Sequence, residues 1–229
     1  MDDVHWSYED DTGPAHWGTL TPAFATCGTG RRQSPIDIVN PIPKVLSPLE
    51  IHYEPIALNI INNGHAIQVN MDPGSYIVLD GVRYDLLQFH FHTLSEHTVD
   101  DEYSVMEMHL VHKSQEDDLA VIGVWMDEGR ANQALDPIWA HMPPDAGPEQ
   151  HHQDVRVNPA DLLPASQQTY RYSGSLTTPP CSEEVKWVMM VESIAVSADQ
   201  VKAFARVFPS NNRPVQPLNG REVFIDIQA

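Results

Sequence analysis

The stretch LLQFHFH at residues 86–92 constrains the fold of this chain more than any other. Aromatic and aliphatic residues alternate there with polar ones, which is typical of a β-strand. Because consecutive side chains on a strand point to opposite faces, Gln88, His90 and His92 share one face and the intervening phenylalanines share the other. Two imidazoles two residues apart on one face can reach a single metal ion.

A second predicted strand, residues 103–112, follows after a polar turn. The same alternation puts Glu107, His109 and Val111 on one face. If the two strands are antiparallel neighbours, His109 can supply a third nitrogen. Three neutral histidines with an open fourth position form the arrangement of a catalytic zinc site.

Packing is the alternative interpretation, because a lone histidine on a strand is more often packed or solvated than a metal ligand. The residues around the histidines favour the metal. Gln88 and Glu107 lie two residues before His90 and His109 on the same faces, where they could accept the second ring N–H of each imidazole. Burying such polar groups unpaired costs about 1–3 kcal/mol each, so a polar functional cavity is favoured over a plain core.

Four sequence blocks, in this order, resemble the α-class carbonic anhydrases. They are QFHFH at 88–92, SEHTVD at 95–100, EMHLVH at 107–112 and SGSLTTPPC at 173–181. The likeness runs from residue 5 to residue 214. It implies an enzyme for the reversible hydration of CO₂ to bicarbonate and a proton, with Zn²⁺ bound by His90, His92 and His109.

The resemblance implies a mainly β fold, with one catalytic domain over residues 1–229, a large, mostly antiparallel, twisted central sheet and a few short peripheral helices. A length of 229 residues, 41% hydrophobic residues and five tryptophans agree with one packed domain. Runs with strand character lie at residues 57–61, 66–71, 75–79, 84–92, 103–112, 120–126 and 185–191.

Helical patterns are few. Residues 131–142 favour a helix that Pro137 divides into two short pieces, and Ser197 and Gln200 form a predicted capping box at the start of another helix. The proline-rich span 143–164 is predicted to be a surface loop with a short helical turn. The first forty residues are expected to form an irregular wrap.

The charge balance is strongly acidic, with 32 Asp and Glu against 13 Lys and Arg. This disfavours nucleic acid and anionic membranes as partners, because both require a cationic surface. A well-solvated surface explains the acidity better than adaptation to salt. No apolar run approaches the roughly 18 residues that span a bilayer, and the chain does not start with the basic and apolar segments of a signal peptide.

The two cysteines, Cys27 and Cys181, do not form a C-x-x-C motif, so a thiol redox site is not indicated, and the sequence leaves their pairing open. The resemblance implies a disulfide, because secreted and bacterial members of the family carry one at these places. Closing a loop of about 155 residues would stabilise the fold by roughly 5 kcal/mol. A disulfide would also indicate that the protein is located in the periplasm or outside the cell, after removal of an export signal.

The resemblance also implies the roles of the remaining site residues. Zinc-bound hydroxide would attack CO₂, and Thr177 would orient it by donating its own proton to ionised Glu96. Glu96 by itself would be interpreted as a surface-loop acid. The apolar wall for CO₂ would include Val111, which shares a strand face with His109. By resemblance, the rest of the wall would be formed by Val121, Leu176, Val185 and Trp187, and Thr178 would help to position bicarbonate.

By resemblance, His65 lies at the family's position for proton transfer to solvent. An imidazole suits this role, because it titrates at about pH 6.5 when free. As an isolated turn histidine it would simply be solvated. Tyr8 and Gln68 would lie in the water network at the same rim, and Gln68 departs from the asparagine that many members have there.

Three other functions compete with CO₂ hydration. An acatalytic binding module would have lost a zinc-binding histidine, whereas all three remain. An esterase would use the same hydroxide, but the chain has no H-E-x-x-H motif. A structural zinc would require a fourth protein ligand, and neither cysteine is suitably placed. By resemblance, sulfonamides or anions are expected to inhibit at the zinc, and the chain is expected to form a homodimer.

Overall fold

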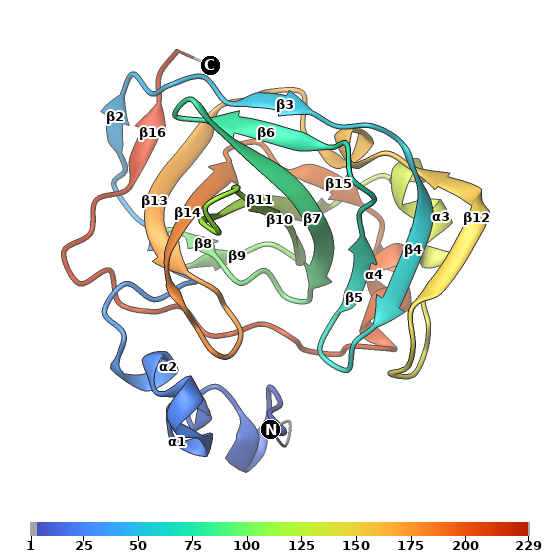
Figure 1. Cartoon of the computed structure of the whole chain (residues 1–229), viewed down its shortest axis with the longest axis horizontal. Coiled ribbons are helices and arrows are strands. Elements are labelled where there is room, and N and C mark those ends of the chain that lie inside the picture. Colours follow the sequence, from blue (N-terminus) through green and yellow to red (C-terminus); the bar gives the residue numbers. More distant parts are fainter. Residues whose placement is uncertain (1–3, 229) are drawn as a thin grey trace.

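A 13-stranded mixed sheet organises the computed structural model, which describes residues 4–228 (Figure 1). Residues 1–3, which belong to the start examined for a signal peptide, lie outside the described residues. The main path of the sheet runs β12-β4-β5-β7-β10-β11-β14-β13-β16-β2. Most neighbours are antiparallel, and the parallel pairs are β11–β14, β11–β15 and β16–β2. The predicted mainly β fold with a large central sheet is confirmed.

The strands of this sheet are β2 (Ile42–Lys44), β3 (Glu50–His52), β4 (Ile56–Asn62), β5 (Ile67–Asn70), β6 (Tyr76–Leu79), β7 (Val82–His92), β10 (Met106–Lys113), β11 (Leu119–Glu128), β12 (Gln150–Val157), β13 (Thr169–Ser175), β14 (Glu183–Met190), β15 (Ile194–Val196) and β16 (Phe224–Asp226). A small second sheet contains β1 (Asp37–Ile38), β8 (Thr98–Val99) and β9 (Glu102–Tyr103). The helices are η1 (Asp10–Thr12), α1 (Trp17–Leu20), η2 (Pro22–Phe24), α2 (Thr26–Thr29), η3 (Gln133–Leu135), α3 (Asp136–Trp139), η4 (Pro159–Leu162) and α4 (Ala198–Ala205).

The main core covers one face of the central strands. Phe89 and Phe91 of β7 are fully buried there, and Phe91 makes edge contacts with Trp139 of α3 and Phe204 of α4. From Gln88 to His92 the side chains of β7 alternate between this core and the opposite face, as the sequence pattern predicts, whereas the register shifts at Leu87. The opposite face therefore carries the polar residues of β7 and β10.

Both predicted helical regions are confirmed. The stretch 131–142 forms η3 and α3, two short pieces that meet beside Pro137. In the capping box of α4, the Ser197 hydroxyl accepts from the Gln200 backbone N–H, and the Gln200 side chain accepts from the Ser197 backbone N–H.

The prediction of a surface loop over residues 143–164 was wrong in its middle part. Residues 150–157 form strand β12, which pairs with β4 at the edge of the sheet, and η4 is the expected helical turn. The strand was missed because its side chains are exposed or half-buried on both faces until Val157, so the sequence has no apolar alternation.

The N-terminal wrap, residues 4–40, contains four short helices and lies against one side of the molecule (Figure 1). Trp17 is its fully buried centre, and the indole N–H donates to the carbonyl oxygens of Ser7 and Thr12. None of the helices in residues 4–228 has the length and apolar character needed to cross a membrane.

Candidate metal centre

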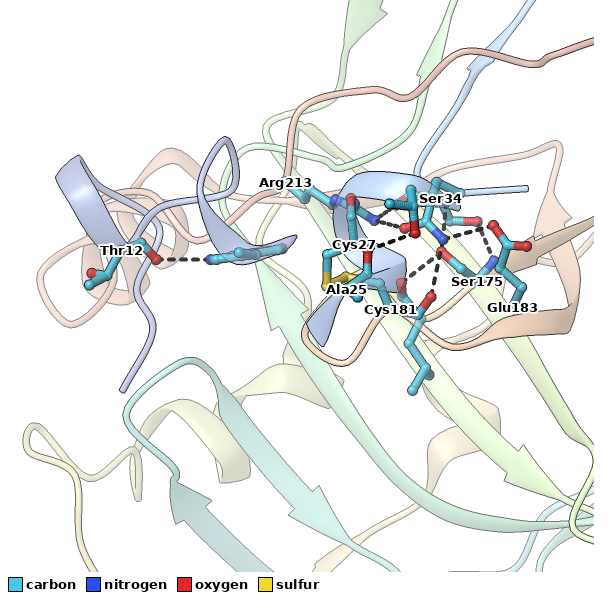
Figure 2. Close-up of a disulfide and its surroundings, with 12 residues drawn as sticks. Thr12, Ala25, Cys27, Ser34, Ser175, Cys181, Glu183 and Arg213 are labelled. Atoms are coloured by element: carbon cyan, nitrogen blue, oxygen red, sulfur yellow. Dashed lines mark hydrogen bonds between the residues drawn. A yellow bond between two sulfur atoms is a disulfide. The ribbon is translucent and has the colours of Figure 1, made fainter. Parts of the chain in front are cut away.

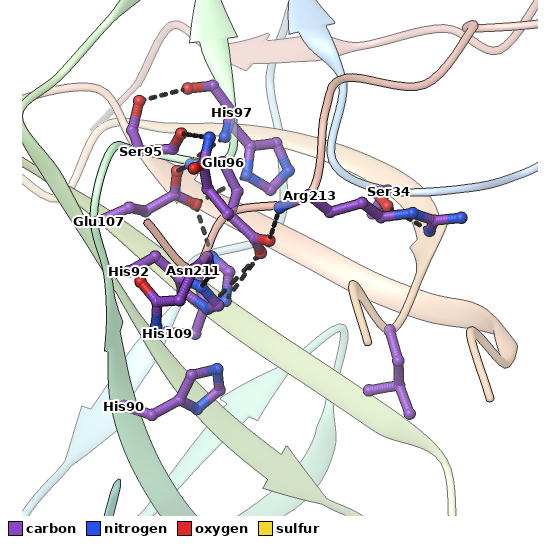
Figure 3. Close-up of polar contacts among 12 residues, drawn as sticks. Ser34, His90, His92, Ser95, Glu96, His97, Glu107, His109, Asn211 and Arg213 are labelled. Carbon is purple, nitrogen blue, oxygen red and sulfur yellow. Dashed lines mark hydrogen bonds and ion pairs between the residues drawn. The ribbon is translucent and has the colours of Figure 1, made fainter. Parts of the chain in front are cut away.

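Three histidines from two adjacent strands converge on the polar face of the sheet (Figure 3). In the antiparallel register of β7 and β10, His109 lies directly opposite His90. One ring nitrogen from each of His90, His92 and His109 lies within 4.8 Å of the others. The geometry expected from strand alternation is therefore present.

In two of these histidines, the ring nitrogen that points away from the centre is hydrogen-bonded to a residue on the same strand. His90 Nδ1 donates to Gln88 Oε1 at 2.8 Å, and His109 Nε2 donates to Glu107 Oε1 at 2.6 Å. Both acceptors lie two residues before the histidine, where the sequence places them. The nitrogens left for a metal are His90 Nε2 and His109 Nδ1.

The acceptor for His92 lies far away in the sequence and was not predicted. His92 Nδ1 donates to the backbone carbonyl of Asn211 at 2.7 Å. The Asn211 side chain fixes this carbonyl in place, because Nδ2 donates to the Phe91 carbonyl at 2.9 Å and Oδ1 accepts from the Thr93 N–H at 2.8 Å. This orientation leaves His92 Nε2 for a metal.

Glu107 is buried with all of its acceptor capacity in use. Besides His109, its Oε1 accepts from His97 Nδ1 at 2.7 Å, and its Oε2 accepts from the backbone N–H groups of Glu96 and His97, both at 2.8 Å. Burial by itself would raise the pKa of Glu107, but His97 and His109 hold it well below the ordinary value through their charge and hydrogen bonds. The residue is therefore a carboxylate that fixes the orientation of two imidazoles.

His97, Glu107 and His109 form a second group with metal-ligand spacing. In this group, both histidines direct a ring nitrogen at the same oxygen of Glu107, and His97 Nε2 is bonded to the Tyr172 hydroxyl at 2.6 Å. These contacts form a hydrogen-bond network without a metal. The first group is thus the better candidate for an ion.

The donor set of the first group fits zinc. Burial lowers the pKa of His90 and His92, so both rings are neutral near pH 7, the state that binds a metal. His92 Nε2 and Glu96 Oε2 are buried without a hydrogen-bond partner in residues 4–228, and they lie 3.6 Å apart. Leaving such groups unpaired is costly, and a divalent cation between the imidazoles would compensate His92 Nε2.

Glu96 is fully buried, so its interpretation as a surface acid from local sequence was wrong. Its Oε1 accepts from the Arg213 backbone N–H at 2.7 Å. No hydrogen bond joins Thr177 to Glu96 within the described part of the chain. Oε2 is the carboxylate oxygen that remains to receive the predicted bond.

A cavity of about 270 Å³ opens beside His90 and His109. Thr177 and Thr178 line it, and its apolar side is formed by Val111, Leu119, Val121, Leu176 and Trp187. Val185 does not line the cavity, but is buried behind it in the same apolar cluster as Val121 and Trp187. Leu119 was missed because the strand was predicted to begin one residue later, at residue 120.

A neighbouring cavity of about 110 Å³ brings together the residues predicted for proton transfer. His65, Tyr8 and Gln68 line it together with His90 and His92. Sequence reasoning missed the role of Trp6, whose ring stacks on His65 with a centroid separation of 3.6 Å. Burial, and to a lesser extent the charge of Glu96, raise the pKa of Tyr8 well above its ordinary value, so its hydroxyl stays protonated.

The disulfide between Cys27 and Cys181 is present, as the resemblance implied (Figure 2). It joins α2 of the N-terminal wrap to the loop that carries Thr177. On the other face of the sheet, His112 is bonded to the Tyr53 hydroxyl at 2.8 Å and takes no part in the metal centre.

Comparisons with known proteins agree with this geometry. A family model of the eukaryotic-type carbonic anhydrases matches residues 12–227. The chain is 46% identical to a carbonic anhydrase of Nostoc sp. over 225 residues, which cover 96% of this chain and 85% of the relative.

Two solved structures superpose closely on the chain. One is the α-carbonic anhydrase of Thermovibrio ammonificans in complex with sulfanilamide, with 43% identity, a TM-score of 0.94 and coverage of 97% of this chain and 99% of that one. The other is a hyperthermostable carbonic anhydrase from a hydrothermal vent chimney, with 44% identity, a TM-score of 0.94 and coverage of 97% and 100%. The chain therefore belongs to the eukaryotic-type, or α-class, carbonic anhydrase family.

Proposed function

We propose that this chain catalyses the reversible hydration of CO₂ to bicarbonate and a proton with one Zn²⁺. The proposal rests on one observation: the convergence of three imidazoles whose outer nitrogens are each bonded to a protein acceptor. Membership of the carbonic anhydrase family supports the same reaction.

His90 Nε2, His92 Nε2 and His109 Nδ1 would hold the zinc. When bound there, Zn²⁺ acts as a Lewis acid and makes a water-derived nucleophile available near neutral pH. Gln88, the Asn211 carbonyl and Glu107 keep the three rings in the orientation and tautomer that the metal needs.

The 270 Å³ cavity is suited to CO₂, because this small molecule carries no net charge and needs an apolar wall beside the nucleophile. Thr177 is assigned the orienting role. If its hydroxyl donates to the unpaired Glu96 Oε2, its oxygen can only accept from the attacking group, so a lone pair of that group points at the carbon. Thr178 lies in the same cavity, where its hydroxyl can hold bicarbonate.

Proton release is assigned to His65. Its ring shares a cavity with His90 and His92, so water can connect them, and Tyr8 and Gln68 offer polar atoms along this path. Gln68 is itself tied to the Asn63 and Asn70 side chains, which limits its rotation.

The variant His90→Ala tests the zinc site. We expect about one zinc per chain in the native protein, loss of zinc in the variant, and a fall in CO₂ hydration of at least about a hundredfold. Metal analysis and stopped-flow CO₂ hydration measure the two quantities. His52→Ala, at an exposed histidine of β3, is the matched control and should retain both. An active His90→Ala variant or a zinc-free active native protein would refute the proposal.

The disulfide supports a periplasmic or extracellular location for the protein. The second candidate function, an acatalytic binding module, is disfavoured because all three ligand histidines are in place. We further propose that sulfonamides bind at the metal, as sulfanilamide does in the complex of the Thermovibrio ammonificans relative.

A further inference from the structure

A cavity of about 520 Å³ lies on the side of the sheet opposite the metal centre. It is bordered by β2, β13, β14 and β16, which are adjacent in Figure 1, and by Asp80 in the turn after β6. In the strand register, Arg171 is paired with Val188, and Ser173 with Lys186, so these residues share the face that continues the main core. Trp187 borders both this cavity and the CO₂ cavity, and its ring lies on the side of His109.

Basic side chains are concentrated around this cavity. The whole chain has only 13 Lys and Arg and a net charge of −19, yet five basic residues line this one site against two acidic ones. The basic residues are Arg32, Lys44, Arg171, Lys186 and Arg221, and the acidic ones are Asp80 and Glu222. A concave surface with an excess of positive charge focuses the electrostatic field, so this cavity favours anions although the protein as a whole is acidic.

Ion pairs neutralise only part of this charge. Lys186 Nζ lies 3.2 Å from Asp80, and Arg32 is paired with Glu184 at 2.7 Å. Within residues 4–228, the other three basic residues have no carboxylate at ion-pair distance. These residues are Lys44, Arg171 and Arg221.

The three unpaired cations are held in place by other contacts. Arg221 donates to the backbone carbonyls of Gln33 and Ser173, among others, which makes it a fixed part of the wall. Arg171 Nε donates to the Thr169 hydroxyl at 3.1 Å, and its terminal nitrogens have no hydrogen-bond acceptor among the described residues. Lys44 Nζ lies 4.2 Å above the ring of Phe224.

Phe224 brings Lys44 and Arg171 close together. It is paired with Arg171 across the β13–β16 register, while its ring contacts Lys44 from β2. Cross-strand partners have Cβ atoms only about 5 Å apart, so Arg171 and Lys44 both lie next to Phe224, Arg171 as its cross-strand partner and Lys44 over its ring. Burial lowers the pKa of Arg171, while the charges of Asp80 and Asp226 raise it, and burial likewise lowers the pKa of Arg221 against the opposing effect of Tyr172 and Glu183.

We propose that this cavity is a binding site for a small multivalent oxyanion, a carboxylate or phosphate compound with at least two acidic groups. Arg171 and Lys44 would make the main contacts, and Arg221 would add a fixed charge. Guanidinium groups match the planar carboxylate and the phosphate in a bidentate manner, and the presence of several cations along one wall favours a ligand with more than one acidic group.

The test is a calorimetric titration of the zinc-loaded protein after its catalytic metal has been saturated with sulfanilamide, so that anions cannot bind there. Propane-1,2,3-tricarboxylate and pyrophosphate, each with more than one acidic group, are the two probes, and the tighter one identifies the preferred chemistry. We expect saturable binding of at least one of them. Absence of saturable binding of both up to about 10 mM, the range of very weak affinity, would overturn the proposal. Because heat is measured, the result does not depend on CO₂ hydration.

Two variants of the wall and one matched control locate the binding site. Arg171→Gln and Lys44→Gln should each weaken binding at least about tenfold, the loss expected for one charge-assisted contact. Arg83→Gln removes the same charge at an exposed arginine outside the cavity and should change the affinity less than about twofold. Equal weakening in all three variants, or none in the two wall variants, would show that the site is not this cavity. All three should retain wild-type CO₂ hydration.

Discussion

Glu107 is the residue on which most hydrogen bonds at the metal centre converge. One oxygen accepts from two imidazoles and the other from two backbone N–H groups. The four donors require a group that only accepts, which is a property of the ionised carboxylate. The residue therefore connects the orientation of His109 to the fold of the segment that carries Glu96.

Replacing this carboxylate by an amide should weaken the metal site. In Glu107→Gln the amide NH₂ faces donors whichever way it turns, so at least one hydrogen bond is lost and His109 is held less well. We expect the zinc dissociation constant to rise about 10- to 100-fold. Competition with a chromogenic chelator measures it, and Glu102→Gln at an exposed strand is the control. Unchanged zinc affinity in the Glu107 variant would contradict the assigned role.

The residues of the site differ in how far they could be predicted. Gln88 and Glu107 could be found because a spacing of two residues on a strand fixes which side chains share a face. Asn211 could not, because it contacts His92 through a backbone carbonyl from 119 residues away, and any residue type has such a carbonyl. The bond between Thr177 and Glu96 could be predicted only from family likeness, because the local sequence at Glu96 indicates a surface acid.

We expect His112 to make the stability of the protein depend on pH. Burial lowers its pKa to about 3 in the folded protein, against ~6.5 for a free imidazole. Between these values the unfolded chain binds a proton that the folded protein does not bind. The free energy of unfolding therefore falls as the pH drops below about 6.5, by about 1.4 kcal/mol per pH unit.

The variant His112→Gln lacks this titration. Between about pH 7.5 and pH 5, the wild-type protein should lose about 2 kcal/mol more unfolding free energy than the variant, as measured by urea denaturation. Tyr53→Phe is a suitable control, because it removes the hydrogen bond to His112 but keeps the titrating ring. Equal pH slopes in wild type and His112→Gln would exclude this residue as the cause.

At the scale of elements, the sequence predicted strands with long apolar patterns and missed strands without them, including β13, which lies inside the sheet and buries Thr169 and Tyr172. The runs that became β4, β7, β10, β11 and β14 carry long apolar patterns. β12, β2 and β16 are short or polar, and they form only because neighbouring strands offer backbone partners. Their existence depends on tertiary context, which local patterns do not contain.

The capping box of α4 joins this helix to its neighbours. Gln200 accepts from the Asn132 N–H at 3.0 Å and donates to the Asn132 carbonyl at 2.8 Å, while Ser197 caps only its own helix. Ser197→Ala should lower the unfolding free energy by about 1 kcal/mol, and Gln200→Ala by more, because it removes bonds between two elements. Urea denaturation measures both. Lys202→Ala, on the exposed side of the helix, should stay within about 0.5 kcal/mol. A smaller effect of Gln200→Ala than of Ser197→Ala would refute the tertiary role.

At the scale of the whole molecule, one cluster of buried contacts joins the N-terminal wrap and the segment around Arg213 to the loop that carries Thr177. Arg213, buried near the C-terminal end, donates to the carbonyl oxygens of Cys27 and Ser34 and to the Gln33 side chain (Figure 2). Its own backbone N–H donates to Glu96. Hydrogen bonds of Arg213 therefore connect the N-terminal wrap and the disulfide to Glu96 beside the metal centre.

Removing the disulfide should affect both stability and catalysis through this connection. Cys27 and Cys181 are separated by 154 positions, so the bond restricts a long loop of the unfolded chain, and the double variant Cys27→Ser/Cys181→Ser should lose up to about 5 kcal/mol of unfolding free energy. Because Cys181 ends the loop that carries Thr177, we expect CO₂ hydration to fall more than zinc content, which depends on β7 and β10. Urea denaturation, metal analysis and stopped-flow hydration are measured on the same sample.

Dithiothreitol should lower the stability of the wild type toward that of the variant and leave the variant unchanged. An equal loss of zinc and activity would show instead that the disulfide acts on the metal centre as a whole.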